Sequence, residues 1–257
     1  MRLKITFANP QEACLPVNYQ HLLTGAVYHL LEASDADYSR FLHEQGYALD
    51  GGPKRFKLFV FSWLRPASRK GLRVEGGRLW LAPGPVAWYL SSPVEAFLTH
   101  SATGLLASGR LQLGAASLAI AQVEALPAPD FSGGVVRFTC LSPIVASVPG
   151  PEGGTRYLRP AETEEFSEAV RRNLVRKYEL LYGRPPKDDR LTLTFDRAYL
   201  ARDPHGGTKK MTFKDIDIVA AYVPFILTGS PELMQTAWNC GLGEKNSGGF
   251  GMVEVAK

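Results

Sequence analysis

The sequence has few cysteines and no long apolar run. Its three cysteines, Cys14, Cys140 and Cys240, are odd in number and far apart in a chain of 257 residues. They predict neither a disulfide framework nor a zinc site, and they indicate a reducing compartment. The apolar runs are too short to cross a bilayer, and the N-terminus lacks the pattern of a signal peptide. These absences favour a cytoplasmic globular protein with no membrane partner.

Two common nucleotide-binding motifs are also absent. No G-x-x-x-x-G-K-[ST] segment occurs, and the segment that begins at Gly241 lacks the third glycine of G-x-G-x-x-G. That segment leads into alternating apolar residues rather than a helix, so the strand–turn–helix context of a dinucleotide site is missing. We therefore expect no cofactor.

Glycine, by contrast, is concentrated near the C-terminus. Five of the eleven residues from Gly241 to Gly251 are glycine. The backbone of such a loop can adopt positive φ and approach another group closely, and its N–H groups can hold a phosphate. The loop is therefore predicted to bind an anion; a glycine-rich hairpin without a ligand is the alternative.

Basic residues gather in three segments of a chain whose net charge is only +4. Eight lysines and arginines lie between Gly51 and Trp80, against the single acid Glu75. Separate basic segments favour a polyanionic partner, most simply a nucleic acid, although surface charge that serves only solubility is the alternative. The other two segments contain Arg171, Arg172, Arg176 and Lys177, and then Lys209 and Lys210.

Periodicity predicts the same order of elements in both halves of the chain. Each half reads strand–helix–strand–strand–helix–strand, the ferredoxin-like order, so we expect an α+β protein of two tandem ferredoxin-like (RRM-like) domains. Pro127, Pro129, Gly133 and Gly134 mark a linker, which gives domains 1–126 and 135–257. The predicted elements are strands 2–7, 56–64, 79–82 and 118–125 with helices 19–32, 35–43 (capped by Ser34) and 94–106, then strands 135–141, 191–200, 216–227 and 249–255 with helices 162–182 and 231–239.

The two ends of the chain carry a resemblance to a known family. The pattern glycine-hydrophobic-glycine, five residues, glycine-hydrophobic-glycine, from Gly241 to Gly251, resembles the signature of the CRISPR-associated RAMP proteins. The N-terminal half adds matches to the endoribonucleases that process precursor CRISPR RNA within its repeats. The resemblance spans nearly the whole chain and is weak from about residue 65 to 130. The N-terminal matches are Tyr19-Gln-His, Gly25-Ala-Val-Tyr28, Phe41-Leu-His43-Glu and Gly52-Pro-Lys54.

This resemblance implies a catalytic set of Tyr28, His43 and Lys54. The implied reaction needs no metal: the ribose 2′-OH attacks the adjacent phosphate and leaves a 2′,3′-cyclic phosphate and a 5′-OH. The implied partner is CRISPR repeat RNA, as precursor and as product, and a CRISPR interference complex and a second copy of the chain are further partners to consider. The expected RNA-binding residues are Gly241, Gly243, Lys245, Asn246, Ser247, Gly249, Phe250, Gly251, Arg55, Lys57, Arg171 and Arg172.

The residue types also suit this chemistry by themselves. Attack by the 2′-OH needs a base, an acid for the leaving oxygen and positive charge for the phosphorane, and histidine is the side chain that exchanges protons most easily near neutrality. At 100° per residue Tyr28 lies outside the apolar arc of its helix, and His43 faces away from Phe41 and its apolar neighbours. Lys54 follows a turn. All three can therefore be exposed, whereas His29 lies at the edge of the apolar arc and is expected to be structural.

Three other functions remain alternatives. A metal-dependent nuclease would need clustered carboxylates, for which Asp215 with Asp217 and Asp188 with Asp189 are the candidates. A non-catalytic RAMP-type RNA-binding scaffold would lack the histidine, and His43 is present. A general RNA-recognition domain would carry the K/R-G-F/Y-G/A-F-V-x-F/Y strand, which the sequence does not contain.

Overall fold

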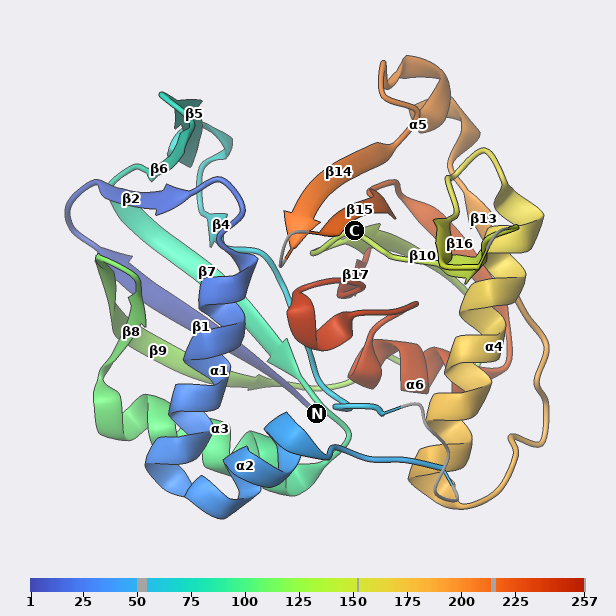
Figure 1. Cartoon of the computed structure of the whole chain (residues 1–257), viewed down its shortest axis with the longest axis horizontal. Helices are drawn as coiled ribbons and strands as arrows, with labels where there is room; N and C mark the ends of the chain where they lie inside the picture. The colour runs from blue at the N-terminus through green and yellow to red at the C-terminus, as the bar shows by residue number, and fades with distance from the viewer. Residues whose placement is uncertain (50–54, 152, 214–215, 257) are drawn as a thin grey trace.

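Two halves of the chain lie side by side in the computed structural model (Figure 1). The structure describes residues 1–49, 55–151, 153–213 and 216–256. The N-terminal half, blue to green, builds one large sheet, and the C-terminal half, yellow to red, builds another. Smaller two- and three-stranded sheets extend from these two.

The strand β1 (Arg2–Asn9) is at the centre of the N-terminal sheet. Leu3, Ile5 and Phe7 alternate along it and are buried, so one face of the sheet forms a hydrophobic core. β1 pairs antiparallel with β7 on one side and β9 on the other, in the sheet order β3-β7-β1-β9-β8. The remaining strands of this sheet are β3 (Val60–Phe61), β4 (Arg65–Pro66), β7 (Gly84–Ser91), β8 (Arg110–Leu113) and β9 (Ala116–Leu126).

Three helices belong to this half: α1 (Gln20–Ser34), α2 (Ala36–Glu44) and α3 (Glu95–Ser108). α1 and α3 pack on each other and share the core with β1, while α2 packs on α1. The cap of α2 differs from the prediction. Asp35 accepts the N–H of Tyr38 at 2.9 Å, whereas the predicted cap, Ser34, is the last residue of α1 and hydrogen-bonds His100 at 3.0 Å.

The predicted strands of this half were partly wrong. Residues 79–82 form β6 (Arg78–Leu81), which belongs to a separate sheet with β2 (Ala13–Pro16) and β5 (Leu72–Glu75). The central strand β7 was not predicted, because the run Pro83-Gly84-Pro85 is typical of a turn. The predicted strand 56–64 is regular only at β3, because Leu58 has a φ of 53°, which interrupts extended backbone.

The C-terminal sheet has the order β13-β16-β10-β17. Phe138 on β10 lies opposite Phe225 on β16 and Val255 on β17. Its core is completed by the helices α4 (Thr163–Tyr182) and α6 (Pro231–Cys240). The four strands are β10 (Val135–Cys140), β13 (Leu191–Phe195), β16 (Phe225–Gly229) and β17 (Val253–Val255).

Three predicted strands of this half are shorter than expected. The strand predicted over 249–255 is regular only at β17, because Gly249 and Gly251 have positive φ. The strand predicted over 191–200 ends at Phe195, because Asp196 accepts the N–H of Tyr199 and begins the helix α5 (Arg197–Arg202). The strand predicted over 216–227 divides into β15 and β16. The remaining elements are the hairpins β11 (Ser147–Pro149) with β12 (Thr155–Tyr157) and β14 (Thr208–Phe213) with β15 (Ile216–Ala221), and the short 3₁₀ turns η1 (Arg69–Gly71) and η2 (Asn246–Gly248).

The four principal strands of each large sheet, counted along the chain, lie in the spatial order second–third–first–fourth. The orders are β3-β7-β1-β9 in the N-terminal sheet and β13-β16-β10-β17 in the C-terminal sheet. The protein therefore has the predicted α+β fold of two tandem ferredoxin-like units. We infer domain bounds of 1–126 and 135–257, and the separate hydrophobic clusters of the two halves support them. None of the helices in the described ranges is long and apolar enough to span a membrane.

Arg2 joins the two halves through a buried guanidinium. Its Nη1 donates to the carbonyl of Val253 at 2.7 Å and its Nη2 to that of Trp238 at 2.9 Å. The guanidinium also lies 3.4 Å from the centroid of the Trp238 ring, a cation–π contact. Burial lowers the pKa of Arg2. The first strand of the chain is thus bound to its last strand and last helix.

The close packing of α1 against α3 predicts that a larger residue at Gly104 would destabilise the protein. A Cβ at Gly104 would lie 2.1 Å from the carbonyl oxygen of Leu30. We expect Gly104→Ala to lower the free energy of unfolding by about 3 kcal/mol, because the two helices would have to move apart. Gly133→Ala is the control, since a Cβ there meets nothing within 4 Å. Urea denaturation of both variants measures the difference; equal stability would contradict this packing.

Candidate active site

Tyr28 and His43 lie next to each other at the surface of the N-terminal half. Their ring centroids are 5.0 Å apart with an interplanar angle of 84°, an edge-on contact. Tyr28 is in the middle of α1 and half-buried, whereas His43 is in the last turn of α2 and exposed. The α1–α2 corner brings them together, and the hydroxyl of Ser39 ties the helices by donating to the carbonyl of Tyr28 at 3.2 Å. Two of the three predicted catalytic residues are therefore in contact.

The phenol of Tyr28 keeps its proton at physiological pH. Burial raises the pKa of Tyr28 to about 12, because the phenolate would lose its hydration among the apolar residues beside it. Its ring also meets that of Phe59 edge-on at 6.2 Å. Tyr28 can thus donate a hydrogen bond beside His43, but it is a poor base.

The third predicted residue, Lys54, lies outside the described residues. The lysine that the structure does place beside His43 is Lys57. Its Nζ donates to the carbonyl oxygens of Leu42 and His43, the latter at 2.6 Å. A cation at this position satisfies open carbonyls at the end of α2 and suits the negative end of the helix dipole. Burial lowers the pKa of Lys57. Lys57, predicted only to bind RNA, also positions the helix end that carries His43.

A cavity of about 440 Å³ opens in front of these residues. His29, which was expected to be structural, is exposed and lines this cavity. Glu32, which the sequence did not single out, also lines it, and its Oε2 lies 3.6 Å from Nδ1 of His29. The available signal was their spacing, since His29 follows Gly25 by four residues and Glu32 follows Tyr28 by four, which places them on one helix face. The lining residues are His21, Thr24, Gly25, Tyr28, His29, Glu32, His43, Lys57, Ser247 and Gly248.

The glycine-rich loop forms the wall of this cavity opposite α1. As predicted, its backbone has positive φ and approaches another group closely, but that group is the protein itself. A Cβ at Gly251 would lie 2.0 Å from the carbonyl oxygen of Leu242, and one at Gly243 would lie 2.1 Å from that of Val145. The glycines with positive φ are Gly241, Gly243, Gly249 and Gly251.

A buried lysine holds the loop in this shape. Nζ of Lys177, on α4, donates to the carbonyls of Gly241 at 2.8 Å and Gly243 at 2.9 Å and to Oδ1 of Asn246 at 2.7 Å. Nδ2 of Asn246 then donates to the carbonyls of Leu242 and Phe250, each at 3.0 Å. One amine and one amide therefore organise the loop from its centre.

The predicted RNA-binding residues of the loop differ in exposure. Gly241, Gly243, Gly249 and Gly251 are buried, and Phe250 is fully buried in an apolar cluster with Val145 and Met211. RNA binding by these five residues stays a prediction.

The tip of the loop keeps the features expected of an anion site. Lys245 is exposed with a φ of 57°, and Ser247 is half-buried at the cavity. In the described part of the chain, the backbone N–H groups of Lys245, Asn246 and Ser247 reach no hydrogen-bond acceptor. Those of Gly248 and Gly249 donate within the loop. A phosphate at the tip could therefore find three open N–H groups and an amine.

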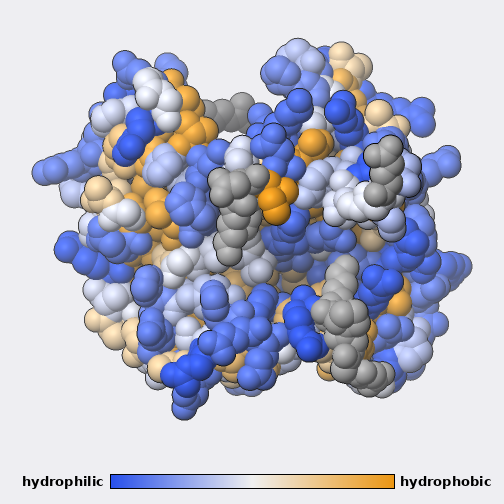
Figure 2. Space-filling model, in the orientation of Figure 1, coloured by the Kyte–Doolittle hydropathy of each residue, from blue (hydrophilic) through white to orange (hydrophobic). Residues whose placement is uncertain are grey.

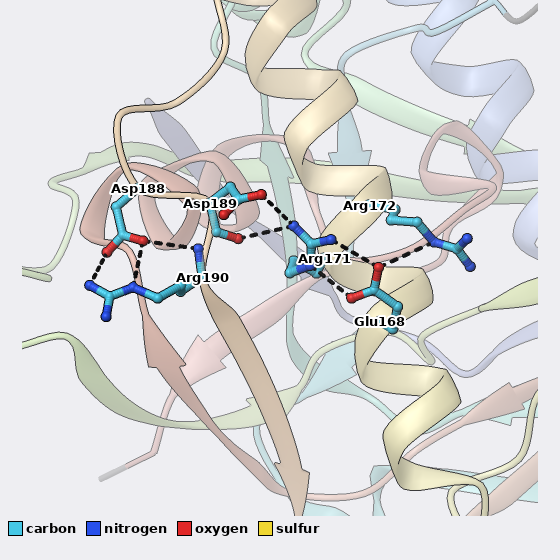
Figure 3. Close-up of polar contacts among 6 residues, drawn as sticks. All are labelled: Glu168, Arg171, Arg172, Asp188, Asp189 and Arg190. Atoms are coloured by element: carbon cyan, nitrogen blue, oxygen red, sulfur yellow. Dashed lines mark hydrogen bonds and ion pairs between the residues drawn. The ribbon is translucent and has the colours of Figure 1, made fainter.

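The predicted arginines on α4 differ in how far their charge is already paired (Figure 3). Arg171 is bound to both oxygens of Glu168, at 2.7 and 2.9 Å, and to Asp189 at 2.8 Å. Arg172 is exposed and lies 3.6 Å from Glu168. Arg172 is therefore the better cation for an incoming polyanion, because the charge of Arg171 is shared between two carboxylates.

Hollows in the surface connect the cavity to α4. Lys57 and Ser247 also line a second hollow of about 290 Å³, together with Arg55 and Lys245. That hollow shares Asn173 and Glu244 with a third, of about 420 Å³, which reaches Arg172 and Arg176. Figure 2 shows the same face of the molecule as mostly hydrophilic. A groove therefore runs from His43 across the loop tip to α4.

The carboxylates proposed for metal binding have other partners. Asp188 binds Arg190 through both of its oxygens at 2.9 Å, and Asp189 binds Arg171 (Figure 3). Asp217 accepts the hydroxyl of Thr212, and Asp215 lies outside the described residues. In the ranges that the structure covers, no three His, Cys, Asp or Glu side chains are grouped as metal ligands.

Two family models match the chain in succession. The model described as "CRISPR-associated protein Cas6, N-terminal" matches residues 14–124, and "CRISPR associated protein Cas6, C-terminal" matches residues 126–255. The second match alone covers half of the chain. Both halves of the protein therefore have a counterpart in one group of proteins.

Individual proteins with Cas6 names are also similar to this chain over most of its length. A Methanocaldococcus jannaschii protein named "CRISPR-associated endoribonuclease Cas6 1" is 28% identical over 263 residues, covering 98% of this chain and 92% of that protein. The Pyrococcus furiosus "CRISPR-associated endoribonuclease Cas6" is 28% identical over 243 residues, covering 94% and 83%. A solved structure described as "Characterization of a Cas6-related gene from Pyrococcus furiosus" has a TM-score of 0.81 at 20% identity, over 100% of this chain and 98% of that one. The last comparison supports the fold alone.

The buried amine of Lys177 generates a prediction about stability. We expect Lys177→Met to lower the free energy of unfolding by about 3 kcal/mol, because it leaves buried acceptors of the loop without a donor. The neighbouring, exposed Arg176 supplies the control, Arg176→Met, which should change stability by less than about 0.5 kcal/mol. Urea denaturation of both variants measures the effect. Parental stability of Lys177→Met would show that the loop does not depend on this amine.

Proposed function

The chain belongs to the Cas6 family of CRISPR-associated proteins, and on this premise we propose that it is an endoribonuclease that cuts precursor CRISPR RNA within its repeats. Two relatives that match over nearly the whole chain carry the name endoribonuclease. The observation that carries the proposal is the contact between the rings of Tyr28 and His43 at a cavity that also contains Lys57. These groups provide a proton carrier, a hydrogen-bond donor and a cation in one place.

We propose that the reaction is metal-independent. His43 takes the proton of the ribose 2′-OH, the 2′-oxygen forms a bond to phosphorus, and the bond from phosphorus to the 5′-oxygen breaks. The departing 5′-oxygen takes a proton from water, and the hydroxide that remains neutralises the protonated His43, which leaves a 2′,3′-cyclic phosphate and a 5′-OH. Because Tyr28 stays protonated, its role is to donate a hydrogen bond to the phosphate or to the leaving oxygen. Lys54 remains the proposed source of charge for the phosphorane.

The groove suggests how the RNA lies. The polymer would pass the loop tip, where Lys245 and the open N–H groups can bind phosphates, and continue toward Arg172. Arg55 lines the groove between these points and is a further backbone contact. Such contacts position RNA through phosphates without reading its sequence. Repeat RNA is thus the proposed partner both before and after cleavage.

The second candidate function is a non-catalytic RNA-binding scaffold of the same superfamily. It requires only the groove and the loop tip. His43 favours the enzyme over the scaffold. Its exposed imidazole contacts the protonated phenol of Tyr28 in a cavity that a polymer could enter, and RNA binding alone does not need this pair.

Substitution of His43 separates cutting from binding. We expect His43→Ala to cut repeat RNA about 10²–10⁴ times more slowly, because the proton carrier is lost, while RNA affinity is retained. His205→Ala, an exposed loop histidine, is the control. Single-turnover cleavage and fluorescence anisotropy measure the two properties. Cleavage by His43→Ala at the parental rate would rule out this role for His43.

The chemistry of the cut is tested on the substrate. We expect cleavage to continue in EDTA, because the proposed groups supply the proton transfer and the charge. A repeat RNA with a single 2′-deoxyribose at the cut site should bind and stay intact, because it lacks the attacking hydroxyl. Product ends are identified by mass spectrometry. Loss of activity in EDTA would contradict the metal-free route, and cleavage of the deoxy substrate would contradict attack by the 2′-OH.

A further inference from the structure

Gly25 has no structural reason to be glycine in this fold. It lies inside the regular helix α1, at a φ that any residue can adopt, and among the described residues a Cβ there would meet nothing within 4 Å. Glycine is less favourable than alanine in a helix interior, because it has more conformational freedom to lose. Gly104, the interior glycine of α3, differs, since a Cβ there would collide with α1. The empty space beside Gly25 is therefore a feature that packing does not explain.

That space belongs to the cavity at Tyr28 and His43. Gly25 lies one helical turn before Tyr28, and His21 and His29 lie one turn to either side of Gly25 on the same face. The absence of a side chain leaves the backbone of α1 as the floor of the cavity between the two histidines.

The opposite wall is held at a set distance from this floor. The hydroxyl of Thr24, next to Gly25, donates to the carbonyl of Ser247 at 3.2 Å, across 223 positions of the chain. Ser247 and Gly248 line the cavity from the loop side. A ligand that reached the floor would thus lie between α1 and the loop tip, beside the catalytic pair.

The groups around this space suit an anion. Among the described residues, the cationic or ionisable nitrogen groups that line it are those of Lys57, His21, His29 and His43, and the carboxylate of Glu32 lies 3.6 Å from His29. Imidazoles donate hydrogen bonds to phosphate and to ribose hydroxyls. The volume of about 440 Å³ is within the usual range of ligand pockets.

We propose that Gly25 is the floor of a nucleotide subsite, where the ribose–phosphate unit that flanks the scissile bond lies directly against α1. This proposal rests on the proposed function. Gly25 is a positioning residue: it lets the backbone approach the sugar closely, so that the 2′-OH and the phosphate reach His43 and Tyr28 together. A side chain at this position would lift the nucleotide away from the catalytic pair.

The experiment adds bulk at Gly25 and, as a control, at Ala33, an exposed residue of α1 outside the cavity. Gly25→Ala should raise Tm through its helix propensity yet lower kcat/KM for repeat RNA by about tenfold, since one methyl displaces the sugar. Gly25→Leu should lower kcat/KM by about 10²-fold or more and weaken binding of the uncleavable 2′-deoxy RNA. Ala33→Leu should match the parental chain in both assays.

The outcomes separate this inference from the proposed function. Parental kcat/KM for Gly25→Ala and Gly25→Leu in a chain that cuts repeat RNA would overturn the subsite and leave the enzyme in place. A parental chain that neither binds nor cuts repeat RNA would overturn the proposed function itself. If Gly25→Leu folds poorly, Gly25→Ala decides, because a gain in stability together with a loss of activity cannot come from damaged packing.

Discussion

The buried amine of Lys177 is the interaction on which the site depends most. Three oxygens of the glycine-rich loop converge on it, and the loop closes around it with backbone distances that only glycine tolerates. An amine taken out of water needs such partners, and the loop carbonyls need a donor, so each stabilises the other. The loop tip, Lys245 to Ser247, has backbone N–H groups that reach no acceptor in the described part of the chain. The proposed anion site would thus be a consequence of what the loop does inside the protein.

The cavity exists only because the two halves of the chain are fixed against each other. One wall comes from α1 and α2, and the other comes from the loop between α6 and β17. Arg2 binds the carbonyls of Trp238 and Val253, and Thr24 binds that of Ser247, so contacts across more than 220 positions set the distance between the walls. The proposed cleavage by positioned side chains would be sensitive to displacements of about 1 Å, so fixed walls would matter for it.

Much of the fold was predictable, because helix and strand periods are local properties. The apolar arc of α1, the long helix α4 and the central strands β1 and β10 were predicted nearly in full. The errors occur where a local signal competes with tertiary pairing: the turn-like Pro83-Gly84-Pro85 concealed β7, and Asp35 rather than Ser34 caps α2. The resemblance pointed to Tyr28 and His43 as a pair, and their ring contact agrees with it. It did not indicate the cavity-facing His29 or the part that Lys57 plays at the end of α2.

The sequence by itself determined the principal helices and the first strand of each half, because these follow from residue spacing over a few turns. It predicted the ferredoxin-like class of each half and allowed His43 to be exposed, but it did not locate the third strand β7. It also determined that the terminal loop would adopt positive φ. Only the tertiary structure decided that the loop glycines pack against protein and that Phe250 is buried. It likewise decided which side chains share one cavity. The physical reason is that these features depend on hydrogen bonds made by Lys177, Thr24 and Arg2 to residues that are 64, 223 and 251 positions away in the sequence. A pattern of neighbouring residues does not show which distant residues will meet.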